Sequence, residues 1–422
     1  MEATRIRLAE GVHLTYLPAR KFKTSLLSAQ FVTPLRRETA GANALLAAVL
    51  RRGTVSCPDM GALSAKMDNL YDASIDYTVR KKGENQCVGF VASFIDDRYA
   101  PDGERLLEPA AALLGELICD PVTYHGRFVP EYFESEKTNL LEAIRSLIND
   151  KRDWADSRLL RALCDGEAYA VPRLGDEETV DKLQALKVYT QYRDLISTAP
   201  LEIIYSGSAD LERVKQALAA AFATLPREEV RVISTSAPHV CRESVQYVED
   251  VLDVTQGKLG MGFSCGSDDM PALLMGNTLF GGSSNSKLFL NVREKLSLCY
   301  YASSLYHRQK GLITVSSGIE FQNYQRAYDE IMVQLEAVQK GELEDWELEG
   351  ARSTLLNSYA TVGDSQGKLE NFYLGQAATG QHETPADLAR AIQDMTAERI
   401  CRAMSTVKLD TVYFLKGKEA EA

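Results

Sequence analysis

Histidine is scarce in this sequence, and no two cysteines form a C-x-x-C pair. Zinc sites built from local spacing need histidines or cysteines a few residues apart. None of the five histidines lies three to five residues from another histidine or a cysteine; they are His13, His125, His239, His307 and His382. The sequence therefore predicts no local zinc site, and its eight scattered cysteines predict mostly reduced, partly buried thiols.

Long apolar runs are also absent. No stretch reaches the roughly 18 residues that a membrane span requires, and the N-terminus lacks the basic, apolar and small-residue pattern of a secretory leader. We therefore expect a cytoplasmic protein with no membrane partner. The net charge of -12 disfavours nucleic acid as a partner, because Lys and Arg contacts to phosphate supply most of that affinity.

Two segments of the 422-residue chain share one layout, which indicates an internal duplication. In the first half, an apolar helical segment leads to Gly53, and Tyr71 follows 18 residues later. In the second half, a segment that begins at Ala272 leads to Gly282, and Tyr300 follows after another 18 residues. The length of the chain fits two or three domains.

Strand-like stretches flank both segments, and long helical stretches follow them. The expected strands cover 12–17, 25–35, 73–81 and 86–94 in the first half, and 245–251, 258–265, 300–306 and 312–320 in the second. Apolar residues at three- and four-residue steps predict a helix over 324–340 with one buried stripe. Runs of strands with segregated helices predict an α+β domain that occurs twice.

The polar, proline-flanked segment 226–242 is the expected linker. It divides the chain into an N-terminal domain at 1–225 and a C-terminal domain at 243–422. The alternative is a long surface loop within one domain.

The sequence resembles the pitrilysin/insulinase family of zinc peptidases nearly from end to end. It is most similar to the two-domain bacterial and mitochondrial-processing type, and among these to YmfF-like members. The resemblance is carried by LAEGVHLTYLPARKFKT, LSAKMDNLYDASIDY, PEYFESEKTNLLEAIRSLINDKRDWA and, most specifically, LFGGSSNSKLFLNVREKLSLCYYA. It implies two homologous domains, each an antiparallel-rich mixed β-sheet with helices packed on one face.

The family's zinc helix carries H-x-x-E-H, followed by an apolar stretch and a Gly-Thr pair. The corresponding stretch here is ALLAAVLRRGT, which ends at Gly53-Thr54. Counting back from this pair places the histidine positions on Ala44 and Ala48, and the general-base position on Ala47. The resemblance therefore implies a chain with no zinc of its own and no activity alone.

The family's third ligand is a glutamate seven residues after another acidic residue. Glu136 matches that earlier residue, which puts Ala143 at the ligand position. Glu142 lies one helical step, or about 100°, away and is expected to point off the site. We expect Glu134, Glu136 and Glu142 to form a solvated helix face.

In its second domain the family provides an arginine and a tyrosine seven residues apart, which bind substrate or stabilise the oxyanion of the intermediate. Arg293 and Tyr300 match this spacing, and Tyr301 is the runner-up for the tyrosine. The alternative interpretation is a surface arginine and a half-buried strand tyrosine.

A glycine- and serine-rich loop precedes this motif. We consider it a candidate for binding a peptide through its free amides, although helix capping alone also explains its composition. Its residues are Gly281, Gly282, Ser283, Ser284 and Asn285.

Lost zinc ligands and a retained arginine and tyrosine imply a division of labour. The leading hypothesis is a zinc-free subunit of a heterodimeric peptidase, whose homologous partner brings Zn²⁺ and the base and cleaves a peptide substrate. The second hypothesis is a non-enzymatic peptide-binding or scaffold protein that uses the same cavity. A homodimer, which would be inert, also remains open.

Overall fold

The computed structural model describes residues 3–233 and 237–418. Three residues of the expected linker, 234–236, lie outside this range, and the described parts of 226–242 form neither helix nor strand. The chain divides into two compact units. Unit 1 comprises 1–145, 171–235 and 363–382, and unit 2 comprises 146–170, 236–362 and 383–422.

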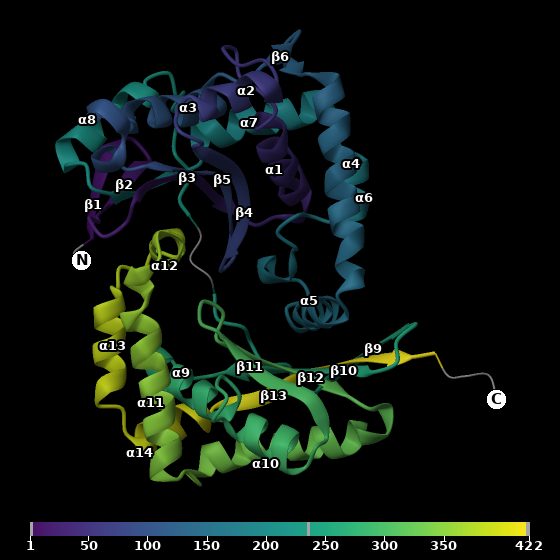
Figure 1. Ribbon diagram of the computed structural model, residues 1–422. Helices are drawn as coiled ribbons and strands as arrows, with labels where there is room; N and C mark the ends of the chain where they lie inside the picture. The colour runs from purple at the N-terminus through teal and green to yellow at the C-terminus, as the bar shows by residue number, and fades with distance from the viewer. Residues whose placement is uncertain (1–2, 234–236, 419–422) are drawn as a thin grey trace. The chain divides into compact units, whose positions relative to one another are not determined.

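Unit 1 is built on a six-stranded mixed sheet of order β1-β2-β8-β3-β5-β4, in which only the β2–β8 pair is parallel (Figure 1). Its strands are β1 (Thr4–Ala9), β2 (Val12–Pro18), β3 (Thr24–Pro34), β4 (Ser74–Lys82), β5 (Asn85–Ile95) and β8 (Leu201–Gly207), with a small hairpin of β6 (Thr123–Tyr124) and β7 (Arg127–Phe128). Its helices are α1 (Arg37–Leu50), α2 (Met60–Asp68), α3 (Leu107–Cys119), α4 (Pro130–Ser146), α6 (Glu177–Asp181), α7 (Ala185–Thr198), α8 (Leu211–Ala221) and α12 (Gln366–Ala378).

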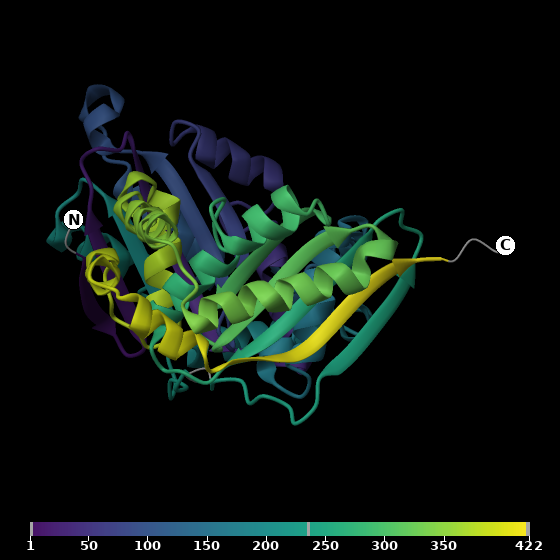
Figure 2. The same ribbon diagram turned by 90° about the horizontal axis from the view of Figure 1, so that it is seen from below.

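Unit 2 is built on a five-stranded sheet of order β11-β12-β10-β13-β9, in which only the β13–β9 pair is parallel. Its strands are β9 (Gln246–Leu252), β10 (Gly257–Cys265), β11 (Cys299–His307), β12 (Leu312–Ile319) and β13 (Val407–Gly417). Its helices are α5 (Lys151–Leu163), α9 (Met270–Phe280), α10 (Tyr324–Lys340), α11 (Asp345–Ala360), α13 (Pro385–Gln393) and α14 (Ala397–Met404), with a π-helical segment at Leu288–Lys295. Figure 2 shows α10, in light green, lying along this sheet.

The two sheets confirm the predicted duplication. Strands β2, β8, β3, β5 and β4 of unit 1 correspond in order and direction to β9, β13, β10, β12 and β11 of unit 2, and β1 is an additional edge strand. All eight predicted strands are present, and α10 spans the predicted 324–340 with Ala327, Ile331, Leu335 and Val338 buried. The α+β fold is therefore repeated, as the sequence indicates.

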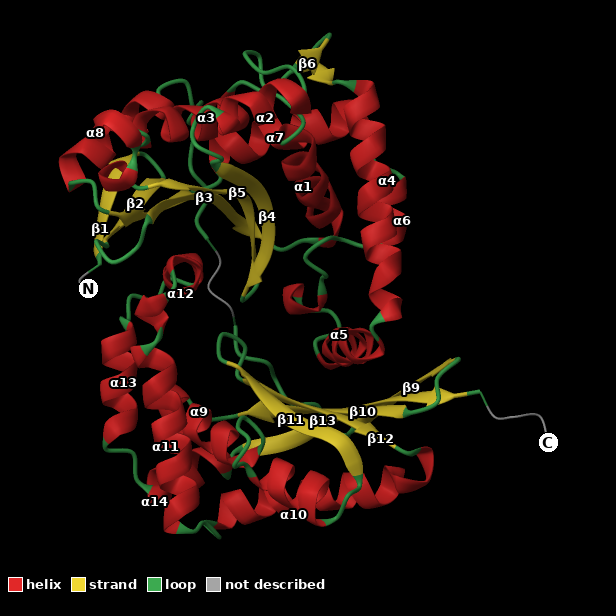
Figure 3. Cartoon of the chain, in the orientation of Figure 1, coloured by secondary structure: helices red, strands yellow, loops and turns green. Residues whose placement is uncertain are grey.

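The main helices cover one face of each sheet (Figure 3). In β3, Leu27, Ala29 and Phe31 point into the core beneath α3, α7 and α8, because alternate residues of a strand face opposite sides. In β10, Leu259, Met261 and Phe263 belong to the equivalent core of unit 2. No helix in the described residues combines the length and the apolar character needed to cross a bilayer.

Each sheet also carries a helix on its opposite face, and these helices depart from the continuous domains 1–225 and 243–422 expected from the sequence. Segment 146–170, with α5, belongs to unit 2, and segment 363–382, with α12, belongs to unit 1. The reason lies in the residues on the second face of each sheet. Their size and polarity are complementary to α5 in unit 2 and to α12 in unit 1.

In unit 2 the match is apolar and depends on two glycines. A Cβ at Gly262 would lie 2.7 Å from a methyl carbon of Leu163, and one at Gly260 would lie 3.2 Å from a methyl carbon of Leu159. Because Gly260 and Gly262 have no side chain, α5 can lie close to β10.

In unit 1 the match is polar. Glu370 of α12 accepts a hydrogen bond from Ser28 Oγ at 2.7 Å and pairs with Arg80 Nη1 at 2.6 Å. Gln366 donates to the backbone oxygens of Ser206 at 2.7 Å and Thr24 at 3.0 Å. These contacts satisfy polar groups that the sheet would otherwise bury unpaired.

Candidate functional site

Helices α1 and α4 of unit 1 carry the positions at which the family resemblance places zinc ligands. Helix α1 is rich in alanine, the best helix former, and every residue from Ala40 to Leu50 is buried. Ala44 and Ala48 are four residues apart and therefore share one face of α1. Helix α4 is amphipathic, with Phe133, Leu140 and Leu141 buried, and it carries Ala143 near its C-terminal end.

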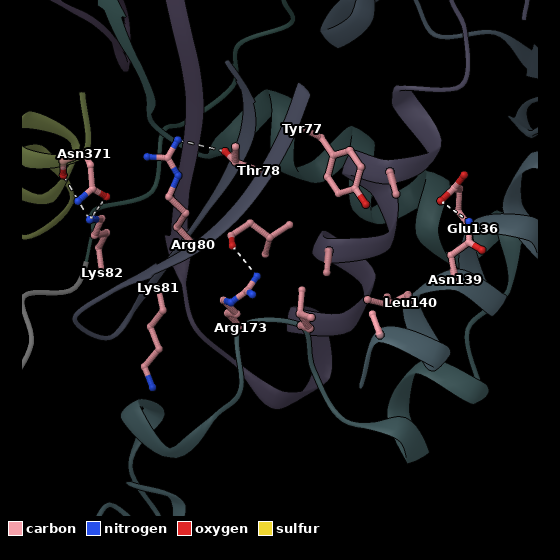
Figure 4. A pocket seen from close by; sticks show the side chains of 15 residues that line it. Tyr77, Thr78, Arg80, Lys81, Lys82, Glu136, Asn139, Leu140, Arg173 and Asn371 are labelled. Atoms are coloured by element: carbon pink, nitrogen blue, oxygen red, sulfur yellow. Dashed lines mark hydrogen bonds between the residues drawn. The ribbon is translucent and has the colours of Figure 1, made fainter. Parts of the chain in front are cut away.

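The three alanines meet at one pocket of about 770 Å³ in unit 1 (Figure 4). Strand β4, helices α1, α4 and α12, and the loop before α6 contribute to its walls. Its lining residues are Ala44, Ala48, Tyr77, Thr78, Val79, Arg80, Lys81, Lys82, Glu136, Asn139, Leu140, Ala143, Arg173, Leu174 and Asn371.

The residues at these positions do not fit a zinc ion. Zinc binds cysteine sulfur, histidine nitrogen or carboxylate oxygen, whereas Ala44, Ala48 and Ala143 offer only methyl groups. Ala47, at the general-base position, is fully buried in the core and is not among the residues that line the pocket. These positions therefore offer zinc no ligand.

The expectation of a solvated acidic face on α4 is wrong for Glu136. Glu134 and Glu142 are exposed, but Glu136 is 9% exposed and lines the pocket. Arg52 Nη1 lies 3.0 Å from its Oε1, and Asn139 Nδ2 donates to its Oε2 at 3.1 Å. The Arg52 partner offsets the cost of burying this carboxylate.

Basic side chains gather at the other end of the pocket, which sequence reasoning missed. Figure 4 shows Arg80 and Lys82 far from Glu136 and Asn139, with Arg173 between the two ends. Burial lowers the pKa of Lys82, and the nearby charge of Arg80 lowers it further. The run Arg80-Lys81-Lys82 at the end of a predicted strand was an available signal, whereas Arg173 had none.

Arg293 and Tyr300 lie in unit 2, each with a partner of its own. Arg293 is in the π-helical segment, 4.7 Å above the Phe289 ring, with its side chain 40% exposed. Tyr300 is 54% exposed at the start of edge strand β11 and donates a hydrogen bond to Glu320. Among the described residues, no hydrogen bond joins Arg293 to Tyr300.

Tyr301, the runner-up, follows Tyr300 in β11 and is half-buried. The guanidinium of Arg152 in α5 stacks 4.4 Å from its ring, and burial is the main cause of its raised pKa. This environment is that of a packed strand residue.

The glycines of the loop before the π-helical segment are needed for close approach. A Cβ at Gly281 would lie 2.7 Å from the backbone nitrogen of Ser304, which donates to the Gly281 oxygen at 2.9 Å. Gly282, Ser284 and Asn285 are exposed, and Ser283 is half-buried with its hydroxyl donating to the Thr278 oxygen at 3.3 Å. The loop thereby fixes α9 against β11.

A second group of possible metal ligands lies inside unit 2. Cys164, Glu167 and His239 place ligand atoms within 4.8 Å of one another, and we call this group the His239 cluster. The acidic groups of this cluster already have cationic partners. Lys310 pairs with Glu167. Asp410, which also contacts His239, lies 2.6 Å from Arg242. A divalent ion would have to bind beside the buried Lys310 and the half-buried Arg242, which is unfavourable.

Comparison with known proteins identifies the family of this chain. The chain is 34% identical over 416 residues, 97% of its length and 96% of the relative's, to the probable inactive metalloprotease YmfF of Bacillus subtilis. The family model described as "Peptidase M16 inactive domain" matches residues 182–355. The chain belongs to the M16 peptidase family.

Solved structures share the fold of this chain. A conserved protein from Enterococcus faecalis V583 superimposes with a TM-score of 0.90 at 27% identity over all of both chains. A peptidase M16 inactive domain from Pseudomonas fluorescens superimposes with a TM-score of 0.81 at 17% identity, again over both whole chains. The chain is thus an M16 metallopeptidase homologue with alanine at the expected ligand positions.

Proposed function

We propose that this chain is the zinc-free subunit of a heterodimeric M16 peptidase and has no activity alone. A homologous partner subunit would bring Zn²⁺ and the general base, and this chain would bring Arg293 and Tyr300. The observation that supports the proposal most directly is the convergence of Ala44, Ala48 and Ala143 on one pocket in a metallopeptidase fold.

The chemistry assigned to Arg293 and Tyr300 is charge stabilisation. Hydrolysis of a peptide develops a negative oxygen, and a fixed guanidinium or hydroxyl donor at that oxygen lowers the barrier. Both side chains are 40% or more exposed, so each is open to a substrate or a partner subunit. Tyr300 would have to exchange its hydrogen bond to Glu320 for one to the substrate.

Reconstitution tests this function. The purified chain, a candidate zinc-binding homologue and their mixture are assayed for zinc content and for cleavage of a quenched peptide library. The chain alone should hold no stoichiometric zinc and cleave nothing, and the mixture should cleave. One tightly bound zinc ion per isolated chain would refute the proposal.

Variants of the mixture test the two residues. Arg293→Ala or Tyr300→Phe should lower turnover by about 10²-fold or more if the residue stabilises the oxyanion. The matched control is Arg326→Ala, which removes an exposed arginine from α10. Unchanged turnover in both variants would remove Arg293 and Tyr300 from the mechanism and leave the heterodimer to be judged by the cleavage itself.

A second candidate function is peptide binding without cleavage. It is favoured by the preserved pocket beside β4, a strand at the edge of its sheet to which an extended peptide could add. Peptide binding by the chain alone, with no cleavage in any mixture, would support this function over the first.

A further inference from the structure

The pocket of unit 1 is electrostatically divided. Its acidic lining residue, Glu136, lies at one end and is paired with Arg52. Arg80, Lys81 and Lys82 come from the last three residues of β4, at the other end, and Arg173 lies between (Figure 4). This concentration of cations stands out in a chain of net charge -12.

Two of these cations have only neutral partners. Lys82 Nζ donates to the Asn371 side-chain oxygen at 2.7 Å and to its backbone oxygen at 3.2 Å. Arg173 Nη1 donates to the Val79 oxygen at 3.0 Å. Within residues 3–233 and 237–418, neither forms an ion pair, whereas Arg80 is neutralised by Glu370.

Among the described lining residues, no carboxylate lies at this end of the pocket, although the charge of Glu370 in α12 still acts on Lys82. Burial and the charge of Arg80 lower the pKa of Lys82, so a nearby negative charge would stabilise its ammonium form. The guanidinium of Arg173 matches a carboxylate in shape as well as in charge. A carboxylate would gain a charge-assisted hydrogen bond from either group.

The position of these cations on an edge strand indicates the class of ligand. Residues 77–82 of β4 line the pocket, so an extended peptide added to this edge would run past Lys82 and Arg173. Side chains two residues apart along such a peptide lie roughly 7 Å apart and point to the same side. A peptide with acidic residues would present carboxylates to the basic end.

We propose that this pocket selects an extended peptide with a carboxylate that binds at its basic end, near Lys82 and Arg173. The inference rests on the peptide-binding role proposed above and adds the chemical class of the ligand. The carboxylate belongs either to an Asp or Glu side chain or to the C-terminus of the peptide.

Binding to the full chain is measured by fluorescence anisotropy with labelled decapeptides that differ only in Glu against Gln at alternate positions, each as a free acid and as a C-terminal amide. The Glu peptides should bind at least about tenfold more tightly, as one charge-assisted hydrogen bond predicts. If the C-terminus supplies the carboxylate, the free acids should bind more tightly than the amides. Replacing Glu by Gln should then have no effect.

Variants locate the contact. Lys82→Gln and Arg173→Gln should each remove about tenfold of the affinity for the peptide that carries the selected carboxylate, and leave that for the matched peptide without it unchanged. The matched controls are Lys187→Gln and Arg193→Gln, which make the same charge changes at exposed positions of α7. Thermal unfolding of each variant checks that the fold is intact.

The outcomes separate this inference from the function on which it rests. Equal affinity for all the decapeptides, unchanged by Lys82→Gln and Arg173→Gln, would overturn the acidic selectivity and leave peptide binding standing. Absence of binding to every peptide, together with no cleavage by the reconstituted mixture, would overturn both. A labelled single-stranded oligonucleotide that binds as tightly as the Glu peptide would show a general polyanion site and also overturn the inference.

Discussion

Restoring the missing ligands is expected to create a zinc site in unit 1. The triple variant Ala44→His, Ala48→His and Ala143→Glu would direct two imidazoles from α1 and a carboxylate from α4 into one pocket of about 770 Å³. Zinc in catalytic sites takes three protein ligands at about 2.0–2.2 Å and leaves the fourth position to water. The pocket is the volume in which these side chains would meet.

The expected gain can be estimated ligand by ligand. Structural zinc sites with four ligands supply about 10–16 kcal/mol, so one ligand contributes roughly 2.5–4 kcal/mol. The step from the double histidine variant to the triple variant should therefore lower Kd by roughly 10²–10³-fold. Lys82 and Arg173 in the same pocket would repel the zinc ion, so we expect a decrease in Kd nearer 10²-fold.

Competition with a chromophoric chelator measures this Kd, and elemental analysis gives the stoichiometry. The matched control pairs the two histidines with Thr138→Glu, which places the carboxylate on α4 at an exposed position outside the pocket. A folded triple variant that binds zinc no better than this control would refute the convergence of the three positions.

Three other perturbations test the fold. Gly115→Ala should destabilise unit 1 by about 1–3 kcal/mol in chemical denaturation, because its Cβ would lie 2.1 Å from the Ala221 oxygen where α3 crosses α8. The control Gly367→Ala should cost nothing, because its Cβ would meet only Ser365 Oγ, at an ordinary contact distance of 3.8 Å. Burial would raise the pKa of Asp96, but hydrogen bonds from Ser208 and Arg98 outweigh it and lower the pKa; this carboxylate therefore adds stability above about pH 3.9 that is lost as the pH falls. The stability advantage of the native chain over Asp96→Asn should accordingly shrink between pH 5 and pH 3 in urea titrations, and a constant advantage would contradict this. Chelators and added zinc should leave the Tm of the native chain unchanged, and a rise of several degrees with zinc would mean that the His239 cluster binds metal.

Much of the architecture could be predicted from local patterns. The eight strands, the helix at 324–340 and the duplication follow from periodicities of two and 3.6 residues, which depend only on near neighbours. The convergence of Ala44 with Ala48 has the same origin, since both lie on one helical turn. The roles of Arg293, Tyr300 and the loop 281–285 remain predictions.

Tertiary structure decided what local pattern does not encode. Periodicity shows which face of a helix is buried but not against which sheet, so the exchange of α5 and α12 between units was not foreseen. Gly260 and Gly262 marked a close approach on β10, but Leu159 and Leu163, about a hundred residues earlier, supply the helix that uses it.

The candidate site divides in the same way. From the sequence alone, the family resemblance predicts alanine at each expected ligand position, because each position is counted along one helix. Only the tertiary structure showed that Glu136 is buried against Arg52 and that Arg173 joins the end of β4 in one basic pocket. These charged residues are far apart in the chain and come together only when the helices and strands pack. Their electrostatic interaction energy depends on burial, which a local sequence pattern does not show.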